Sequence, residues 1–185
     1  MTLQSEPPKT LDQKFFYKAR KFSFEANLLQ LPNGSEGVYS CVRHPGGAMI
    51  VPITDEGKLV LVKQYRFVLA GRLRDFPAGT VEVGEDPALT VRRELEEETG
   101  YRGHQWEHLG NFPLAPGYSD EIIYAYLARN LEKLETPPAQ DEDEDIEVIL
   151  MTPAELEAAI LAGEPVDGKT IAGLVLANKY LAAQA

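Results

Sequence analysis

The chain has 185 residues, which is enough for one domain with a well-formed core and a small appended subdomain. Hydrophobic residues make up 44% and charged residues 25%, an ordinary globular mixture that excludes a wholly disordered chain. The formal net charge of −11 argues against a nucleic-acid or anionic-membrane partner, because both need clustered Lys and Arg. The single cysteine, Cys41, excludes an internal disulfide framework and a zinc site of the CxxC type.

The N-terminal sequence MTLQSEPPKT has neither the basic segment nor the apolar segment of a secretory signal. No apolar run reaches the roughly 20 residues that span a bilayer. We therefore expect a soluble, cytoplasmic protein.

The first half of the chain predicts strands separated by turn residues. Residues 1–13 contain two prolines and few apolar side chains, so we expect a disordered tail there. The strand-like stretches that follow are residues 15–31, 38–43, 48–53 and 59–65. The turn sequence at residues 55–57 (DEG) predicts that the last two of these strands form a β-hairpin. A loop rich in Gly and Arg is expected over residues 71–84.

The second half of the chain alternates helices with strands. Residues 86–99 carry an apolar stripe at helical spacing, and Gly100 occupies the position that commonly ends a helix. The later segments are strands over residues 110–114, 122–128 and 147–151 and helices over residues 153–162 and 170–183. Because strands and helices interleave without the regular βαβ rhythm of a parallel sheet, we predict an α+β fold.

Three acidic residues define the most informative helix. Glu94, Glu97 and Glu98 are three and four positions apart, so their carboxylates share one helix face. Such like-charge pairs destabilise a helix by roughly a few tenths of a kcal/mol each, and a bound Mg²⁺ would reverse that effect. The alternative is a solvated surface helix rich in Glu and Arg, which is a common composition.

A longer pattern surrounds these acids. It runs glycine, five residues, glutamate, seven residues, Arg-Glu, an aliphatic residue, one residue, Glu-Glu, one residue, glycine and a final apolar position. The matching positions are Gly79, Glu85, Arg93, Glu94, Leu95, Glu97, Glu98 and Gly100. The segment resembles the Nudix box without a gap. Only Tyr101 departs from the pattern, because the last position is usually aliphatic.

The resemblance implies the Nudix fold, in which a mixed β-sheet lies between helices as an αβα sandwich. It also implies an enzyme that binds two or three Mg²⁺ ions, with Mn²⁺ as an alternative, and hydrolyses a nucleoside diphosphate linked to another moiety. Glu94 and Glu98 would be the principal metal ligands, and Glu97 a further ligand or a catalytic residue that orients water. The remaining matched positions would support the box structurally: Gly79, Glu85, Arg93 and Gly100.

The segment before the box narrows the resemblance to one branch of the family. Residues 75–79 read DFPAG, which is similar to the Glu-Leu-Pro-Ala-Gly of the ADP-ribose and nucleoside-diphosphate-sugar pyrophosphatases. Asp75 replaces the usual Glu of that motif. The likeness implies that the backbone carbonyl of Ala78 is a metal ligand.

A loop after the box points to the same branch. Pro116 lies 16 residues after Gly100, the spacing of the ADP-ribose enzymes, and residues 116–121 (PGYSDE) resemble their catalytic loop. Glu121 would then be the general base, with Asp120 as the second candidate. The alternative is an ordinary Pro-Gly turn followed by solvated acids.

The likeness extends over residues 15–183 and implies two regions. Residues 14–46 would form an N-terminal antiparallel β subdomain that mediates homodimerisation, with or without strand exchange. Residues 47–185 would form the Nudix catalytic domain.

Four side chains are candidates for binding the substrate, a small nucleoside-diphosphate sugar such as ADP-ribose. The guanidinium groups of Arg66 and Arg43 are suited to the diphosphate, and the rings of Phe22 and Tyr118 to the base. The products would be a nucleoside monophosphate and a sugar phosphate. One alternative is an enzyme that prefers GDP- or UDP-linked sugars. Another is a non-catalytic Nudix regulator that binds such a ligand without cleaving it.

Overall fold

The computed structural model describes residues 6–139 and 145–184 of the chain. Its strands are β1 (Lys9–Lys18), β2 (Ser23–Gln30), β3 (Glu36–Arg43), β4 (Gly47–Pro52), β5 (Leu59–Arg66), β6 (Gly71–Asp75), β7 (Ala78–Thr80), β8 (Tyr101–Pro113), β9 (Ile122–Lys133) and β10 (Ile146–Met151). Its helices are α1 (Pro87–Thr99), α2 (Pro153–Leu161) and α3 (Gly168–Ala182), with a short 3₁₀ turn at Phe67–Leu69. Within these described ranges, none of the helices combines the length and the hydropathy needed to cross a membrane.

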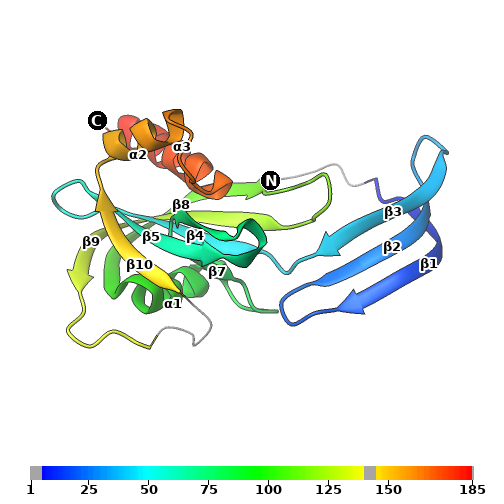
Figure 1. The fold of residues 1–185 in the computed structure, drawn as a ribbon, viewed down its shortest axis with the longest axis horizontal. Coiled ribbons are helices and arrows are strands. Elements are labelled where there is room, and N and C mark those ends of the chain that lie inside the picture. Colours follow the sequence, from blue (N-terminus) through cyan, green and yellow to red (C-terminus); the bar gives the residue numbers. More distant parts are fainter. Residues whose placement is uncertain (1–5, 140–144, 185) are drawn as a thin grey trace.

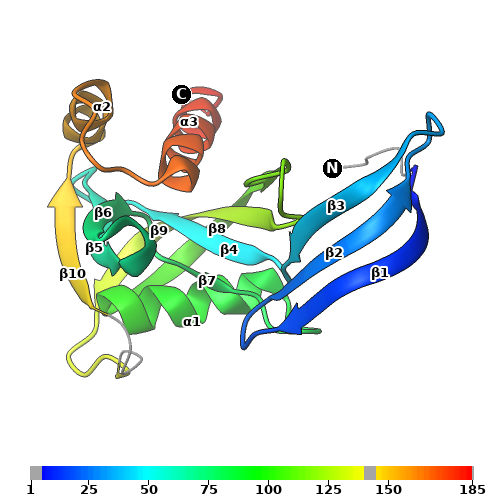
Figure 2. The same cartoon turned by 45° about the vertical axis from the view of Figure 1, so that its right-hand side comes forward.

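A mixed four-stranded sheet forms the centre of the molecule. Its strand order is β7-β4-β9-β8, and β4 runs parallel to β9 while the other pairs are antiparallel. Every residue of β4 is buried, because alternate side chains enter two different cores. Ala48 and Ile50 face the core beneath α1, whereas Met49 and Val51 face the core that includes α2 and α3. Figures 1 and 2 show α1 on one side of this sheet and α2 and α3 on the other, which confirms the predicted α+β class.

A smaller antiparallel sheet of order β10-β5-β6 packs on the α2 and α3 side. The predicted hairpin between β4 and β5 is wrong, because these strands belong to different sheets, and an isolated bridge between Ile53 and Leu59 closes the turn between them. The expected turn is present, with Gly57 at a φ of 75°. The loop predicted over residues 71–84 is also wrong in part, because β6 and β7 lie within it. The first difference arises because β4 and β5 pair with the distant strands β9 and β10, a choice that local sequence does not encode. The second arises because β6 forms a local hairpin with β5, and its Gly- and Arg-rich sequence does not resemble a strand.

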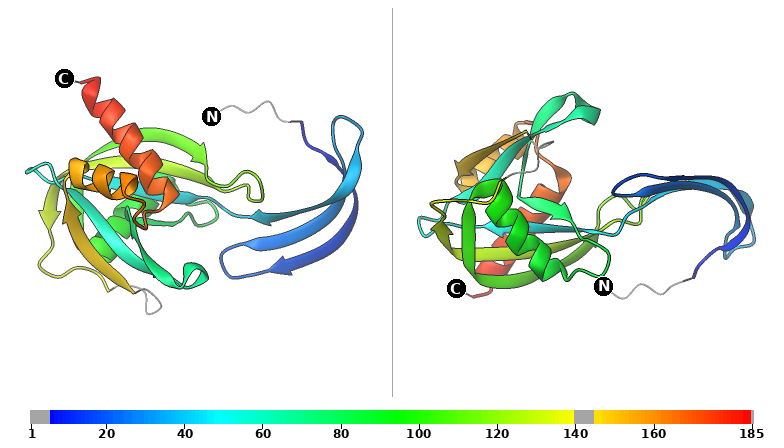
Figure 3. Two further views of the ribbon diagram at one scale, coloured as in Figure 1. Left: turned by 45° about the horizontal axis from the view of Figure 1, so that its top comes forward. Right: turned by 90° about the horizontal axis from the view of Figure 1, so that it is seen from below.

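The N-terminal strands form a separate antiparallel sheet of order β1-β2-β3, which extends away from the body of the molecule (Figures 1 and 3). It begins earlier than predicted, because residues 9–13 belong to β1 rather than to a disordered tail, while residues 1–5 lie outside the described part. The predicted single stretch over residues 15–31 is two strands joined by a turn at residues 19–22. Large apolar side chains are exposed on this sheet: Phe15, Phe16, Tyr17, Phe24, Val38 and Tyr39.

Helix α1 begins and ends where its sequence signals predict. The Asp86 side chain accepts a hydrogen bond from the backbone N–H of Ala88, which caps the first turn, and Pro87 occupies the first helical position. Gly100 ends the helix with a φ of 67°, in the left-handed region that favours glycine. Packing of Val91 and neighbouring apolar residues against the central sheet turns one face of the helix inward. That inward face also carries two of the box glutamates.

Candidate active site

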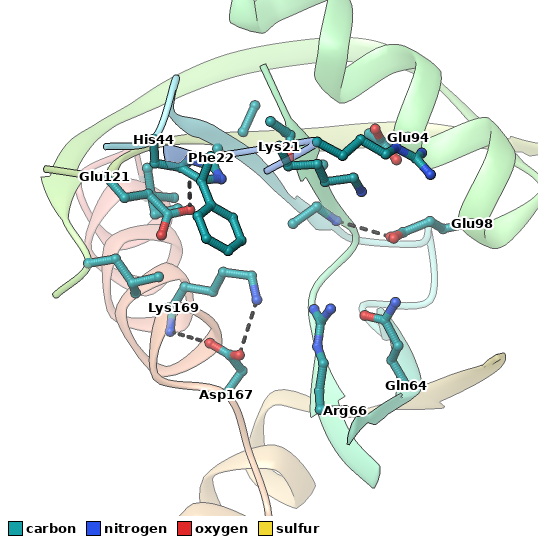
Figure 4. Close-up of a pocket in the computed structure, with 18 of the residues that line it drawn as sticks. Lys21, Phe22, His44, Gln64, Arg66, Glu94, Glu98, Glu121, Asp167 and Lys169 are labelled. Carbon is teal, nitrogen blue, oxygen red and sulfur yellow. Dashed lines mark hydrogen bonds and ion pairs between the residues drawn. The ribbon is translucent and has the colours of Figure 1, made fainter. Parts of the chain in front are cut away.

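A cavity of about 730 Å³ lies where α1, the central sheet, the loop before α3 and the turn between β1 and β2 meet. Among the residues that line it are Ala78, Gly79, Glu94, Glu97, Glu98 and Glu121. The turn at residues 19–22 reaches the cavity from the N-terminal sheet, so that sheet contributes directly to the site. In Figure 4, Glu94 and Glu98 enter from α1 on one side, and Glu121 and Lys169 enter from the opposite side.

Two glutamates on the buried face of α1 stand against strand β7. The side chain of Glu98 is buried and accepts a hydrogen bond of 3.0 Å from the backbone N–H of Ala78. Glu94 packs directly over Gly79, where the Cβ atom of any larger residue would stand 1.8 Å from its Oε1 atom. The box therefore needs glycine at residue 79 because the Glu94 carboxylate occupies the space of a side chain.

Arg93 links the acidic side chains of the box. Its guanidinium lies 2.8 Å from Glu94 and 2.9 Å from Glu97, whereas the distance to Glu85 is 4.0 Å. Burial alone lowers the pKa of Arg93, but the neighbouring carboxylates outweigh it, so the pKa is raised overall. Glu85 instead accepts a hydrogen bond from the backbone N–H of Glu82, which lowers the pKa of its carboxyl and closes the turn before α1.

Glu121 follows a loop that is tied to the end of β3. The backbone N–H of Val42 donates to the carbonyl of Tyr118 at 2.8 Å, and the N–H of Asp120 donates to the carbonyl of Val42 at 3.3 Å. The Asp120 carboxylate accepts a hydrogen bond of 2.9 Å from the backbone N–H of His44, so it also holds the loop next to the end of β3. The Glu121 carboxylate lines the cavity, 3.5 Å from Nδ1 of His44.

The wall nearest α3 carries a compact group of charges. Arg66, Asp167 and Lys169 line the cavity there, and the buried Asp75 lies behind them. Burial alone lowers the pKa of the Lys169 ammonium, but Asp75 and Asp167 outweigh it and raise the pKa overall. The lysine is therefore held in its charged form.

Comparison with known proteins identifies the family of this chain. The family model described as the NUDIX domain matches residues 43–174. The chain belongs to the Nudix family. It is 40% identical over 176 residues to the methanol dehydrogenase activator of Bacillus methanolicus, which covers 95% of this chain and 93% of that protein.

It is also 36% identical over 168 residues to the ADP-ribose pyrophosphatase of Bacillus subtilis (strain 168), covering 91% of each. A solved structure described as an ADP compounds hydrolase superposes with a TM-score of 0.80 at 24% identity, over 100% of this chain and 99% of that one. The predicted Nudix fold is confirmed.

The residues of the Nudix box fit a divalent metal by their chemistry and burial. Glu94 and Glu98 are 8% and 2% exposed, so both carboxylates are largely removed from water, which is costly without a nearby cation. Carboxylate and carbonyl oxygens are the ligands that Mg²⁺ prefers. Arg93 already lies 2.8 Å from Glu94, and Glu98 accepts a hydrogen bond from Ala78, so a metal would add to or replace partners that these carboxylates have. In the described part of the chain, no three acidic, histidine or cysteine side chains already converge as a ligand set. Arg93 bridges Glu94 and Glu97 in that arrangement, so metal binding would replace these ion pairs.

Most of the predicted site residues meet in the cavity of this Nudix domain, including Arg66 and Phe22. Two predicted substrate contacts do not line it. Arg43 lies to one side because its guanidinium is held by Glu25 at 2.7 Å and by Asp120 at 3.2 Å. The Tyr118 side chain is 65% exposed outside the cavity, and only its backbone is held, by β3.

Several cavity residues had no signal in the sequence. They are Lys21, His44, Gln64, Asp167 and Lys169. Asp167 and Lys169 begin α3, and a charged pair at the start of a helix resembles an ordinary cap, which Asp167 also is. Only the packing of this helix against β6 brings them to the site.

Proposed function

We propose that this chain hydrolyses the diphosphate bond of ADP-ribose or a related nucleoside-diphosphate sugar to a nucleoside monophosphate and a sugar phosphate. The observation that carries the proposal is the placement of Glu121 in the same cavity as the α1 glutamates, on the opposite side. The similarity to the Bacillus subtilis ADP-ribose pyrophosphatase supports this substrate class.

In this mechanism the acidic side chains and the loop base have separate roles. Glu94, Glu98, Glu97 and the carbonyl of Ala78 would hold two or three Mg²⁺ ions, for which Mn²⁺ could substitute. These ions supply charge neutralisation of the diphosphate and a lowered pKa of the attacking water. Glu121 accepts the proton of that water as its oxygen bonds to one phosphorus. The bond from that phosphorus to the bridging oxygen breaks, and the bridging oxygen leaves with the other phosphate.

Glu121 is a better candidate base than Asp120. The Asp120 carboxylate is engaged by Arg43 and by the backbone N–H of His44, and it does not line the cavity. Glu121 lines the cavity with 22% of its side chain exposed, so it is accessible to a bound water. Arg66 is assigned to the diphosphate and Phe22 to the base of the substrate.

We also propose that the chain works as a homodimer in the cytoplasm, with residues 14–46 as the dimerisation region, extended by residues 9–13 because they belong to β1. The exposed aromatic and apolar side chains of the N-terminal sheet form a surface that a second copy could bury. A second exposed apolar group, Phe67, Val68 and Leu69, lies on the turn after β5 beside the cavity. Analytical ultracentrifugation should give a dimer, and a monomer would contradict this assignment.

The first test is a hydrolysis panel with Mg²⁺, with Mn²⁺ and with EDTA. The substrates are ADP-ribose, ADP-glucose, GDP-mannose, UDP-glucose, NADH and diadenosine polyphosphates, and the readout is the phosphate-monoester products. Preferential, metal-dependent cleavage of ADP-ribose would support the proposal. Preference for GDP- or UDP-sugars would keep the chemistry and change the assignment of the base pocket. Absence of cleavage of every compound would contradict the proposal.

A non-catalytic role is the alternative from a different functional class, and the Bacillus methanolicus relative carries the name of an activator. Every charged position of the Nudix box is intact in this chain, which favours an enzyme. The same protein sample should be added to a methanol dehydrogenase assay. Activation without any hydrolysis in the panel would establish the regulatory alternative.

A further inference from the structure

A buried charge network lies behind the cavity wall formed by Arg66 and α3. Asp75 is 1% exposed and accepts hydrogen bonds from three side chains. They are the Lys169 ammonium, the Thr170 hydroxyl at 2.7 Å and the Arg66 guanidinium at 3.3 Å. Lys169 also lies 3.2 Å from Asp167. Two carboxylates thus meet two cations, and the network is electrically balanced.

The backbone fixes where this network stands. Asp75 ends β6, and it pairs in register with Val62 of β5, so its side chain shares a sheet face with Val62, Gln64 and Arg66. The loop before α3 is tied to the same strand, because the N–H of Asp167 donates to the carbonyl of Arg74 at 3.0 Å. The first turn of α3 is thereby held against the end of β6, and only Phe76 and Pro77 separate that end from Ala78.

Arg66, Asp167 and Lys169 all line the cavity, and Arg66 is the most exposed member of the network. Its side chain is 38% exposed, whereas those of Asp75 and Lys169 are 2% and 8% exposed. Figure 4 shows Arg66 extending into the cavity beside Gln64. Asp75 engages Nη2, and a guanidinium has five N–H groups in a rigid plane, so the group retains donors for a diphosphate while one edge is fixed.

We propose that Asp75 is a positioning residue that fixes the Arg66 guanidinium at the cavity wall, where Arg66 binds the substrate's diphosphate. This inference rests on the function proposed above. A carboxylate that only neutralised the buried Lys169 would need no contact with Arg66. The Arg66 contact gives Asp75 a second role, in ligand affinity. Asp75 stands where the related motif usually has Glu, so the network depends on a residue that distinguishes this chain from the common pattern.

The test is a set of variants measured for KM, kcat and thermal unfolding with the preferred substrate of the panel. Binding of α,β-methylene ADP-ribose is measured by calorimetry in parallel. Asp75→Asn and Arg66→Ala should each raise KM and the calorimetric Kd about tenfold. In the Arg66→Ala background, Asp75→Asn should cause no further increase. Leu174→Ala is the matched control, because it weakens α3 packing without touching the network, and it should lower Tm with KM unchanged.

A normal KM and Kd for folded Asp75→Asn would overturn the inference, and so would additive effects of the two substitutions. If Asp75→Asn does not fold, the double variant Asp75→Asn with Lys169→Met removes one charge of each sign and keeps the balance. It should show the same raised Kd, again with no increase in the Arg66→Ala background. Failure of the proposed function would be seen separately, as absence of hydrolysis by the wild-type protein.

Discussion

Substitution of Gly79 by alanine should reduce kcat strongly while it reduces the stability of the fold only slightly. The added Cβ would stand 1.8 Å from Oε1 of Glu94, whereas ordinary contacts begin near 3.4 Å. Residue 79 cannot retreat easily, because it lies in β7 and pairs with Ala48 of the buried strand β4. The Glu94 carboxylate must therefore move by about 1.6 Å. Because a misplacement of roughly 1 Å at a reacting centre can cost about 100-fold in rate, kcat should fall by about 100-fold or more.

The assay is steady-state hydrolysis across a Mg²⁺ titration, with thermal unfolding of the same samples. The free energy of unfolding should fall by no more than about 3 kcal/mol, since the displaced carboxylate can move into the cavity. Gly168→Ala is the control, because nothing lies within 4 Å of the added Cβ at that helical position. A kcat for Gly79→Ala near that of the wild type would refute the argument that Glu94 must occupy this position.

Three further predictions concern single carboxylates. Glu121→Gln should reduce kcat by about 100-fold with little change in the Mg²⁺ dependence, because it removes a general base and no proposed metal ligand; unchanged kcat would exclude Glu121 from proton transfer. Asp86→Ala removes the hydrogen bond that the N–H of Ala88 donates to this side chain, and it should lower the free energy of unfolding, measured in urea titrations, by about 1 kcal/mol. Asp86→Ser is the control, because it retains an oxygen that can cap the helix. Asp86→Ala should lose activity at a lower urea concentration than Asp86→Ser.

The third concerns acid stability. Burial alone raises the pKa of Asp167, but Lys169 outweighs it and lowers the pKa below 3.8, so the stabilisation is present above pH 3.8 and is lost as the pH falls through the folded-state pKa. Asp167→Asn should therefore have a lower Tm than the wild type at about pH 6, and the difference should shrink as the pH falls below 3.8. A difference in Tm that stays constant with pH would contradict the lowered pKa of Asp167.

Helix α1 could be predicted from the sequence because its determinants are local. The cap at Asp86, the ending at Gly100 and the spacing of the box glutamates all lie within one short segment. The same holds for the cavity position of Glu121, which the resemblance of its loop indicated. The structure places these residues together, as expected, and explains the glycine at residue 79 by a contact that spacing alone does not show.

The parts that were not predicted depend on contacts between distant segments. The strands β4 and β5 follow one another around a tight turn, yet their partners are β9 and β10, and no local pattern specifies that choice. Likewise, Lys169 and Asp75 are 94 residues apart and meet only when α3 docks on β6. The charge of Arg43 alone suggests a substrate contact, but the nearby acids Glu25 and Asp120 determine the position of its guanidinium.

The hydrogen bonds between Val42 and the loop that ends at Glu121 attach this loop, and with it the proposed general base, to the N-terminal sheet. The same sheet brings Phe22 into the cavity through its β1–β2 turn. With the nucleobase bound at this turn, its contact with the N-terminal sheet would also set the position of the Glu121 carboxylate. Binding energy from the base would then be expressed as faster chemistry rather than as tighter binding. Such an enzyme discriminates between substrates through kcat. A diphosphate that lacks the nucleobase should therefore bind with similar affinity but be hydrolysed more slowly.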